Sequence, residues 1–295
     1  MIDTLDPGTY VVAVSGGVDS VSLLHVLAQQ PHLSLIVAHF DHGIRPDSRA
    51  DREHVQLLAS NWGLPFVYDE VHLGPATSEE AARKARYTFL ERVRQASRAQ
   101  AIITAHHQDD VLETAIHNMR RGTGRRGLTS LASHGPLHRP LLQVPKWKII
   151  DYALEHKLDW HEDSTNADTR YARNYIRHNI VKKLNYEQRA QLLKLIQATL
   201  QLNTEIEQLL INQLHVQPAP NRLARHWFIM LPHAVAKEAL AQWLRQNGIR
   251  SYDKPTLERL VIAGKTALPG KIVDVNGEYQ LLVEKSILAL KHRDR

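Results

Sequence analysis

Six consecutive residues near the start of the chain combine hydroxyl groups with paired glycines, which suits them to binding phosphate. They are Ser15, Gly16, Gly17, Val18, Asp19 and Ser20. Two adjacent glycines let the backbone approach a ligand closely, and serine hydroxyls donate hydrogen bonds to phosphate oxygens. The structural alternative is an ordinary capped helix after a glycine turn, since Ser and Asp are common N-cap residues. The pattern favours a phosphate or pyrophosphate site.

The flanking sequence predicts the elements that hold these six residues. Residues 10–14 form an apolar run typical of a buried strand, and residues 21–28 have a helical pattern. A strand, a glycine turn and a helix in that order direct the first N–H groups of the helix at a ligand above the turn. The helix dipole favours an anion there.

Two further groups of polar residues also follow apolar runs. The run at 33–38 leads into Asp41. The run at 101–104 leads into His106 and Asp110, and a helix is expected from Val111 to Met119. Clustered histidines and aspartates raise the alternative of a zinc-dependent hydrolase. No nearby His-x-His pair completes a zinc shell, so we favour Mg²⁺ carried in with a nucleotide's phosphates. The structural alternative is hydrogen-bonded core histidines and carboxylates placed on a helix dipole.

The order of these elements predicts an α/β fold with a doubly wound parallel sheet. Strand patterns alternate with helical patterns of about 10–20 residues, as in parallel sheets covered on both faces. Ligands of such sheets bind beyond the carboxyl ends of the strands. We therefore expect the three polar loops to face one crevice.

The second half of the chain predicts a different organisation. Residues 187–214 have apolar residues at helical spacing, typical of a long amphipathic connecting helix. Two prolines end that pattern, and a small α+β tail follows, with two helices and a hairpin that turns at Asn276-Gly277. We expect a catalytic domain at 1–184, a helical linker at 185–217 and a small recognition domain at 218–295.

Composition limits the class of protein. The 295 residues contain no cysteine, which excludes disulfides, iron–sulfur clusters and a cysteine nucleophile within them. The net charge of +6 is compatible with a polyanionic partner. No apolar run approaches the ~20 residues of a membrane span, and the N-terminus lacks the pattern of an export signal. We expect a cytoplasmic protein.

Arginines gather in three places that suit nucleic-acid phosphates, and in one of them Arg125 and Arg126 are expected to lie in a flexible glycine-rich loop. Their guanidinium groups bind phosphate in a bidentate manner, although single arginines are more often merely solvated. The candidate substrate-binding residues are Arg45, Arg83, Arg86, Arg125, Arg126, Arg173 and Arg177, and Arg121 is a candidate catalytic residue.

Residues 15–20 resemble the PP-loop of the N-type ATP pyrophosphatases, which split ATP between the α and β phosphates. Six further stretches, in the same order, resemble the tRNA(Ile)-lysidine synthase family in particular. They are residues 39–45 (HFDHGIR), 82–90 (ARKARYTFL), 104–114 (TAHHQDDVLET), 121–124 (RGTG), 139–142 (RPLL) and 173–177 (RNYIR). The resemblance covers about residues 10–180 and is weak beyond residue 184. From the resemblance we expect the chain to be without the additional C-terminal domain of the longer members.

The resemblance implies a PP-loop ATPase, HUP-like fold and a two-step reaction. ATP, with Mg²⁺, adenylates the C2 oxygen of the wobble cytidine of tRNA(Ile) with a CAU anticodon, releasing pyrophosphate. The amine of free L-lysine then attacks C2 and expels AMP, leaving lysidine. It further implies ATP binding by residues 15–20 and a catalytic set of Asp41, His106, Asp110 and Arg121, in which Asp41 or Asp110 positions or deprotonates the lysine. A homodimer is expected by analogy.

Two other functions are compatible with this fold. A tRNA 2-thiolation enzyme depends on cysteines to carry sulfur or a cluster, and the chain has none. A catalytically silent RNA-binding relative would not need an intact loop together with Asp41, His106 and Asp110, all of which are present.

Overall fold

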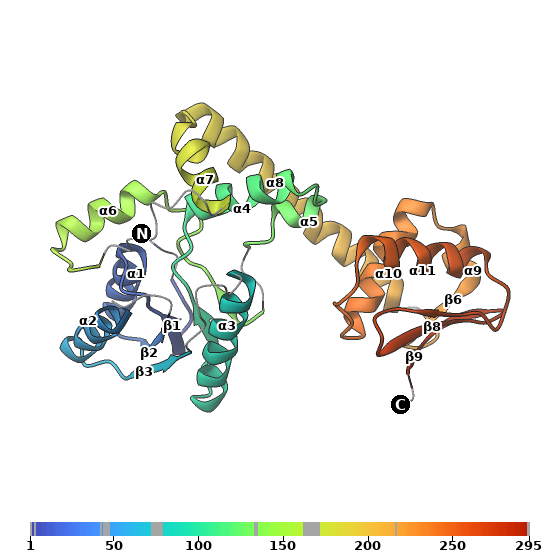
Figure 1. Cartoon of the computed structure of the whole chain (residues 1–295), viewed down its shortest axis with the longest axis horizontal. Helices are drawn as coiled ribbons and strands as arrows, with labels where there is room; N and C mark the ends of the chain where they lie inside the picture. The colour runs from blue at the N-terminus through green and yellow to red at the C-terminus, as the bar shows by residue number, and fades with distance from the viewer. Residues whose placement is uncertain are drawn as a thin grey trace. The chain divides into compact units, whose positions relative to one another are not determined.

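The computed structural model describes residues 2, 4–41, 43, 48–71, 79–132, 135–161, 172–215 and 217–293. The chain divides into two compact units, Met1–Leu200 and Gln201–Arg295 (Figure 1). The long helix α8, Tyr186–His215, crosses that division, close to the predicted range of 187–214. Among the described residues, no helix is both long and apolar enough to cross a membrane.

The first unit is built on a parallel five-stranded sheet. Its strand order is β3-β2-β1-β4-β5, and every pair of neighbours is parallel. The strands are β1 (Gly8–Ala13), β2 (Leu33–Asp41), β3 (Phe66–Glu70), β4 (Ala101–Ile103) and β5 (Leu137–His138). The predicted α/β fold is confirmed.

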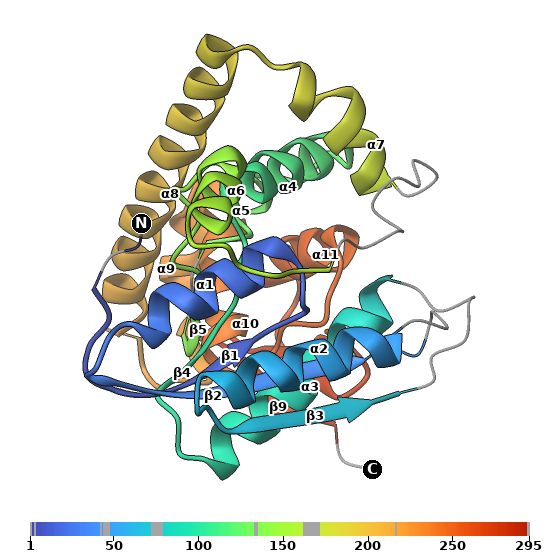
Figure 2. The same ribbon diagram turned by 90° about the vertical axis from the view of Figure 1, so that its left-hand side faces the viewer.

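Helices cover both faces of this sheet, because its strands are apolar on both sides. Val12 packs with residues of α1, α2 and α6 on one face, while Val11 packs with Phe89 and Leu90 of α3 on the other. Figures 1 and 2 show α1 and α2 on one side of the sheet and α3 on the other. The helices and the short 3-10 turn η2 are α1 (Val18–Ala28), α2 (Ser48–Asn61), α3 (Glu79–Ala96), α4 (Gln108–Arg120), α5 (Arg125–Leu128), α6 (Lys146–Glu155), α7 (Ala172–Asn179) and η2 (Val181–Lys183).

Some boundaries differ from the sequence-based prediction. Strand β2 continues past residue 38 to Asp41, because its last residues pair with β3 in the register Asp41↔Glu70. Helix α4 begins at Gln108 instead of Val111, because His107 caps it. Arg125 and Arg126 lie on the short helix α5, where a flexible glycine-rich loop was expected.

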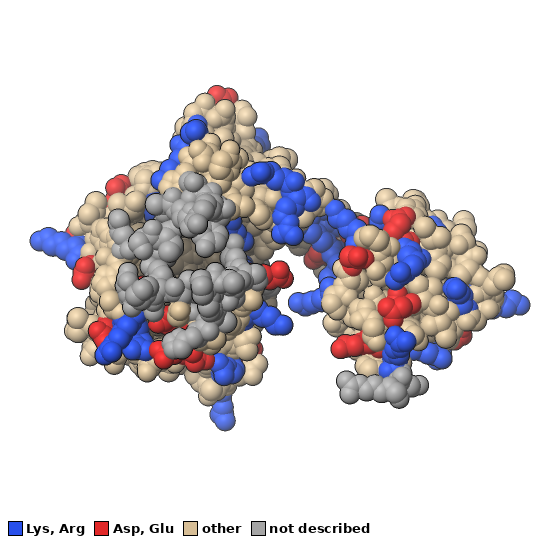
Figure 3. Space-filling view, in the orientation of Figure 1, with Lys and Arg blue, Asp and Glu red and all other residues tan. Residues whose placement is uncertain are grey.

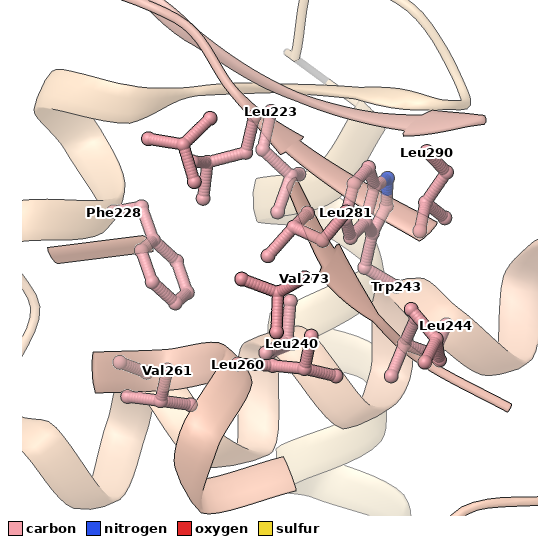
Figure 4. Close-up of a cluster of buried hydrophobic side chains, with 14 of the residues drawn as sticks. Leu223, Phe228, Leu240, Trp243, Leu244, Leu260, Val261, Val273, Leu281 and Leu290 are labelled. Carbon is pink, nitrogen blue, oxygen red and sulfur yellow. The ribbon is translucent and has the colours of Figure 1, made fainter. Parts of the chain in front are cut away.

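The second unit is an antiparallel sheet covered by helices. Its strand order is β6-β9-β8-β7, and the hairpin between β7 and β8 turns at the predicted place, with Gly277 at φ +84°. Trp243 and Phe228 are the largest side chains in its core (Figure 4). The elements are β6 (Arg222–Ala224), α9 (Arg225–Met230), α10 (His233–Gln246), α11 (Lys254–Thr266), β7 (Ile272–Asp274), β8 (Tyr279–Val283) and β9 (Ile287–His292).

A buried arginine ties the elements of the second unit together. Arg225 is 8% exposed, and its guanidinium donates to the backbone carbonyls of Gly264, Ala267 and Glu284. These carbonyls come from the end of α11, the residue that follows it and the turn before β9. One charged side chain thus satisfies three backbone acceptors, in one buried and two part-buried hydrogen bonds.

Candidate functional site

The glycine loop, residues 15–20, joins β1 to α1 and leaves the start of that helix uncapped. Gly16 has φ +94°, and Gly17 is the N-cap of α1, with no hydrogen bond from a capping side chain. The hydroxyl of Ser20 donates to the Gly17 carbonyl at 3.0 Å and accepts from the backbone N–H of Ser15 at 3.2 Å. The serine hydroxyls therefore brace the loop, and no side chain among the described residues accepts a hydrogen bond from the first N–H groups of α1.

The two glycines of the loop are needed for different reasons. Gly16 occupies the left-handed region, where a side chain is strained. Gly17 has an ordinary φ of −76°, and a Cβ placed there would lie no closer than 3.7 Å to its nearest neighbour, the Ser15 hydroxyl. The fold itself would accept a side chain at Gly17. Its absence leaves room for a ligand at the helix N-terminus.

Helix α4 starts at the same edge of the sheet but is capped by its own side chains. The N–H of His107 donates to Asp110 Oδ2 at 2.9 Å, and the N–H of Asp109 donates to His107 Nδ1 at 3.2 Å. This is a capping box in which His107 is the N-cap and Asp110 occupies position N3. Asp110, a predicted catalytic residue, therefore also closes the helix end.

A row of charged side chains connects the glycine loop with α4. Lys146 Nζ lies 2.6 and 2.7 Å from the two carboxylate oxygens of Asp19. Asp19 Oδ2 lies 3.7 Å from His107 Nε2, which is 3.5 Å from Asp110 Oδ2. The loops that follow β1 and β4 are thus joined through their side chains, as their topology predicted.

The row continues to Glu113 through an arginine. Arg177 Nε lies 2.6 Å from Glu113 Oε1, and Arg177 Nη2 lies 3.5 Å from Asp110 Oδ1. Burial raises the pKa of Glu113, which is 3% exposed, against the opposing effect of Arg177. Arg177, expected to contact tRNA, is held here by two carboxylates. We call the set Lys146, Asp19, His107, Asp110, Arg177 and Glu113 the charged row.

Asp41 lies at the end of β2, on the strand next to β1. Asp41 is 7% exposed, and its Oδ1 accepts a hydrogen bond from the N–H of Gly43 at 2.8 Å. Two residues earlier, His39 Nδ1 lies 2.9 Å from the carbonyl of Val14, so Nδ1 carries a proton and donates it. Burial lowers the pKa of His39. The carboxyl end of β2 thus carries a buried aspartate, Asp41.

His106 is a neutral imidazole surrounded by positive charge. Its Nδ1 lies 2.9 Å from the hydroxyl of Thr104. Burial, and then the nearby charges of Arg139, Arg86 and Arg83, hold the pKa of His106 well below its usual range. At neutral pH it acts as a hydrogen-bonding group and carries no charge.

Arg83, Arg86 and Arg139 lie near His106, and Arg173 lies near Arg86, so that the four form an electropositive arginine cluster. Burial lowers the pKa of Arg86 and of Arg139, and repulsion from Arg83 lowers both further. The guanidinium carbons of Arg83 and Arg86 lie 5.0 and 5.4 Å from the centre of the Tyr87 ring. Mutual repulsion among buried cations is relieved by an anion, so this cluster favours a negatively charged ligand.

The other predicted arginines that the structure describes lie on or next to α4 and α5. Arg121 is exposed at the C-terminal end of α4, and Arg125 and Arg126 are partly buried on α5. Figure 3 shows Lys and Arg side chains gathered on the surface around α5. Arg45 lies outside the described residues.

Several residues of the site were not singled out from the sequence. Glu113 lies three residues after Asp110 on the same helix, so helical spacing could have identified it. Arg139 is the first residue of the stretch 139–142, so the resemblance already pointed to it. Lys146 carries no such signal, because its partner Asp19 is remote in sequence.

The part of the chain that the structure describes holds no cluster of three His, Cys, Asp or Glu side chains able to bind a metal ion. The carboxylates of the charged row face Lys146 and Arg177 instead. This arrangement does not favour a dedicated zinc centre.

Comparisons with known proteins agree with this geometry. A family model described as a PP-loop domain matches residues 2–184. A tRNA(Ile)-lysidine synthase of Thermotoga sp. is 42% identical over 195 residues, which cover 61% of this chain and 47% of the relative. One from Gloeobacter violaceus is 33% identical over 308 residues and covers 95% of this chain and 92% of its own length. The chain spans about half the length of the first curated relatives it matches.

A solved structure shares the fold at low identity. The U34-tRNA thiolase NcsA from Methanococcus maripaludis, with its [4Fe-4S] cluster, superposes with a TM-score of 0.56 at 16% identity. The match covers 67% of this chain and 73% of the thiolase.

Proposed function

Since this chain belongs to the PP-loop domain family, and to the tRNA(Ile)-lysidine synthases within it, we propose that it ligates lysine to a tRNA base. The substrate is the wobble cytidine of the isoleucine tRNA with a CAU anticodon. ATP and free L-lysine are consumed, and lysidine, AMP and pyrophosphate are formed. The protein is an ATP-dependent carbon–nitrogen ligase.

In the first step the C2 oxygen of the cytidine attacks the α-phosphorus of ATP, and the bond to the β-phosphate oxygen breaks. The leaving pyrophosphate is bound by the glycine loop, where the uncapped N–H groups of α1 face it. Mg²⁺, held chiefly by the phosphates themselves, would neutralise part of their charge. Asp19 is the loop's carboxylate, and Lys146 holds it in place.

In the second step the lysine amine attacks C2, and the C2–oxygen bond to AMP breaks. The attacking amine must be deprotonated and aligned, and a carboxylate is suited to both tasks. We assign this role to Asp41, because Asp110 already accepts the N–H of His107 and lies beside Arg177. His106 is a neutral hydrogen-bonding partner of the base or the adenylate.

The arginines bind the phosphates of the adenylate and of the anticodon. The electropositive cluster of Arg83, Arg86, Arg139 and Arg173 favours an anion beside His106. Arg121, Arg125 and Arg126 lie further along α4 and α5 and suit the RNA backbone, which gives affinity without base specificity. Arg45 belongs to the same group by its motif.

We assign the chemistry to residues 1–184, the connection to 185–217 and tRNA recognition to 218–295, in a cytoplasmic protein that forms a homodimer. This division differs from that of the two compact units, because α8 runs through the linker.

The observation that carries the proposal is the uncapped N-terminus of α1 at the sheet edge where Asp41 and His106 also lie. The test is incubation of the protein with ATP, labelled lysine and total tRNA. Label in the CAU isoleucine tRNA alone supports the proposal, and label in no tRNA overturns it. A thiolase would instead need cysteines, and these 295 residues have none.

A further inference from the structure

Two histidines lie against the glycine loop and take no part in the chemistry described above. His54 belongs to α2, and His161 follows α6. Their rings stack with centres 4.1 Å apart and an angle of 18° between the planes. Stacking of two rings from segments that are remote in sequence fixes those segments to each other.

His161 reaches the loop through its backbone. Its N–H donates to the carbonyl of Gly16 at 3.0 Å, and its own carbonyl lies 3.9 Å from the place of a Cβ on Gly17. Val55 Cγ2 and His54 Cδ2 lie 3.4 and 3.9 Å from the place of a Cβ on Gly16. The loop therefore contacts both α2 and the segment that carries His161.

Side-chain contacts hold this segment in place. The imidazole Nδ1 of His161 lies 3.0 Å from Asp51 Oδ1, on the first turns of α2. The side chain of His54 is only 7% exposed, and its Nδ1 lies 3.8 Å from Asp159 Oδ2. Its Nε2 is buried and has no hydrogen-bond partner among the described residues.

We propose that His54 and His161 are positioning residues that latch the glycine loop into its phosphate-binding conformation. The latch consists of His54, His161 and Asp51. A trans peptide is planar, so its carbonyl and the following N–H point in opposite directions. Holding the Gly16 carbonyl toward His161 therefore turns the N–H of Gly17 away from that segment. This inference rests on the proposed function only in naming ATP as the ligand.

The latch weakens as the pH falls. Burial foremost, and then the neighbouring His161, lower the pKa of His54, while Asp159 and Asp51 act in the opposite direction. The stacked pair is therefore most stable when His54 is neutral. Protonation of His54 puts a charge into its buried position against the His161 ring, which destabilises the stack.

The test measures binding of ATP, and of pyrophosphate alone, to the full chain by calorimetry. His54→Ala removes the stacked ring and is expected to weaken binding of both ligands about tenfold, the effect of losing one well-placed contact. His54→Phe keeps a planar ring and is expected to bind within about twofold of wild type at pH 7.5. The matched control is His32→Ala. His32 is exposed, and in the described structure its side chain forms a hydrogen bond only with the Leu5 carbonyl.

A pH series separates latching from simple packing. Between pH 7.5 and 5.5 the wild type should lose affinity more steeply than His54→Phe, since the phenyl ring takes no proton. The titration of the nucleotide is common to both proteins and cancels. Amide exchange at His161, whose N–H bonds to Gly16, should be slow in wild type and His54→Phe and faster in His54→Ala.

The outcomes distinguish this inference from the proposed function. Equal binding by wild type and His54→Ala overturns the latch, even if lysidine is formed. Latch-dependent binding of ATP without lysidine supports the latch and overturns the proposed function. A wild type that binds neither ATP nor pyrophosphate overturns both.

Discussion

Lys146 and Asp19, 127 residues apart in the chain, form an ion pair in which the ammonium nitrogen lies 2.6 and 2.7 Å from the two carboxylate oxygens. The aspartate belongs to the glycine loop, and the lysine is the first residue of α6. The pair sets the net charge that an incoming phosphate meets at the start of α1.

Lys146→Gln should raise the KM for ATP about tenfold, because the charge of Asp19 then faces the phosphates without compensation. The rate of lysine transfer at saturating ATP should change little. Lys148→Gln on the same helix is the control, since Lys148 Nζ lies over the Trp147 ring, 5.5 Å from its centre. An unchanged KM in Lys146→Gln would show that the pair is structural only.

Gly17→Ala and Gly16→Ala should separate ligand binding from folding. The first adds a methyl group at ordinary contact distances, so it should cost about 1 kcal/mol of stability or less, yet weaken ATP binding at least about tenfold. The second forces a side chain into φ +94°, at a cost of about 1–3 kcal/mol. Calorimetric binding and urea unfolding of both variants check this. Wild-type affinity in Gly17→Ala would contradict it.

His106 should make the protein sensitive to acid. Its pKa is lowered mainly by burial, while in the unfolded chain it returns to about 6.5. Below that pH the unfolded state binds a proton that the folded state excludes, so the free energy of unfolding falls as pH falls, by about 1.4 kcal/mol per pH unit. His106→Gln should show a shallower loss between pH 7 and 5.5 in urea unfolding.

The comparison for His106→Gln is the same substitution at the exposed His226. Burial also lowers the pKa of His25, His39 and His54, so the slope should decrease in His106→Gln without vanishing. Identical slopes in His106→Gln and wild type would refute the prediction.

Asp41→Asn should separate the two steps of the proposed reaction. The amide still accepts the N–H of Gly43 through its oxygen but cannot take a proton from an amine. We expect ATP–pyrophosphate exchange in the presence of tRNA to remain near the wild-type rate and lysine transfer to fall by about 10²-fold or more. Full lysine transfer in Asp41→Asn would remove Asp41 from the mechanism.

Arg225→Met should destabilise the second unit by about 1–3 kcal/mol, because three carbonyls lose their donor and one of these hydrogen bonds is buried. Amide exchange across residues 222–292 measures the loss. Arg222→Met, at an exposed position three residues earlier, should be near neutral. Equal protection in the two variants would contradict the assignment.

Local patterns in the sequence were enough to predict the architecture. Apolar runs that alternate with helical patterns predicted the parallel sheet, and Asn276-Gly277 predicted the hairpin of β7 and β8. The start of α4 was predicted three residues late, although the pattern of a capping box is visible in His107 and Asp110. Capping signals are usually sought in Ser, Thr, Asp and Asn, and histidine is not among them.

Partners of charged residues could not be predicted in the same way. Arg177 was interpreted as a tRNA contact, and only the fold brings it to Glu113, 64 residues away. Long-range pairs depend on how helices pack, and periodicity within one helix contains no information about its neighbours. The stack of His54 on His161 was invisible for the same reason.

Helices α1 and α4 begin at the same edge of the sheet. Among the described residues, side chains accept hydrogen bonds from the first N–H groups of α4 but not from those of α1. In α4 the protein supplies the acceptors from its own side chains, so this helix is complete without help. In α1 the missing acceptor can come from a bound anion. A phosphate bound there serves as the N-cap of α1. Binding of the anion and formation of the first turn of that helix then stabilise each other.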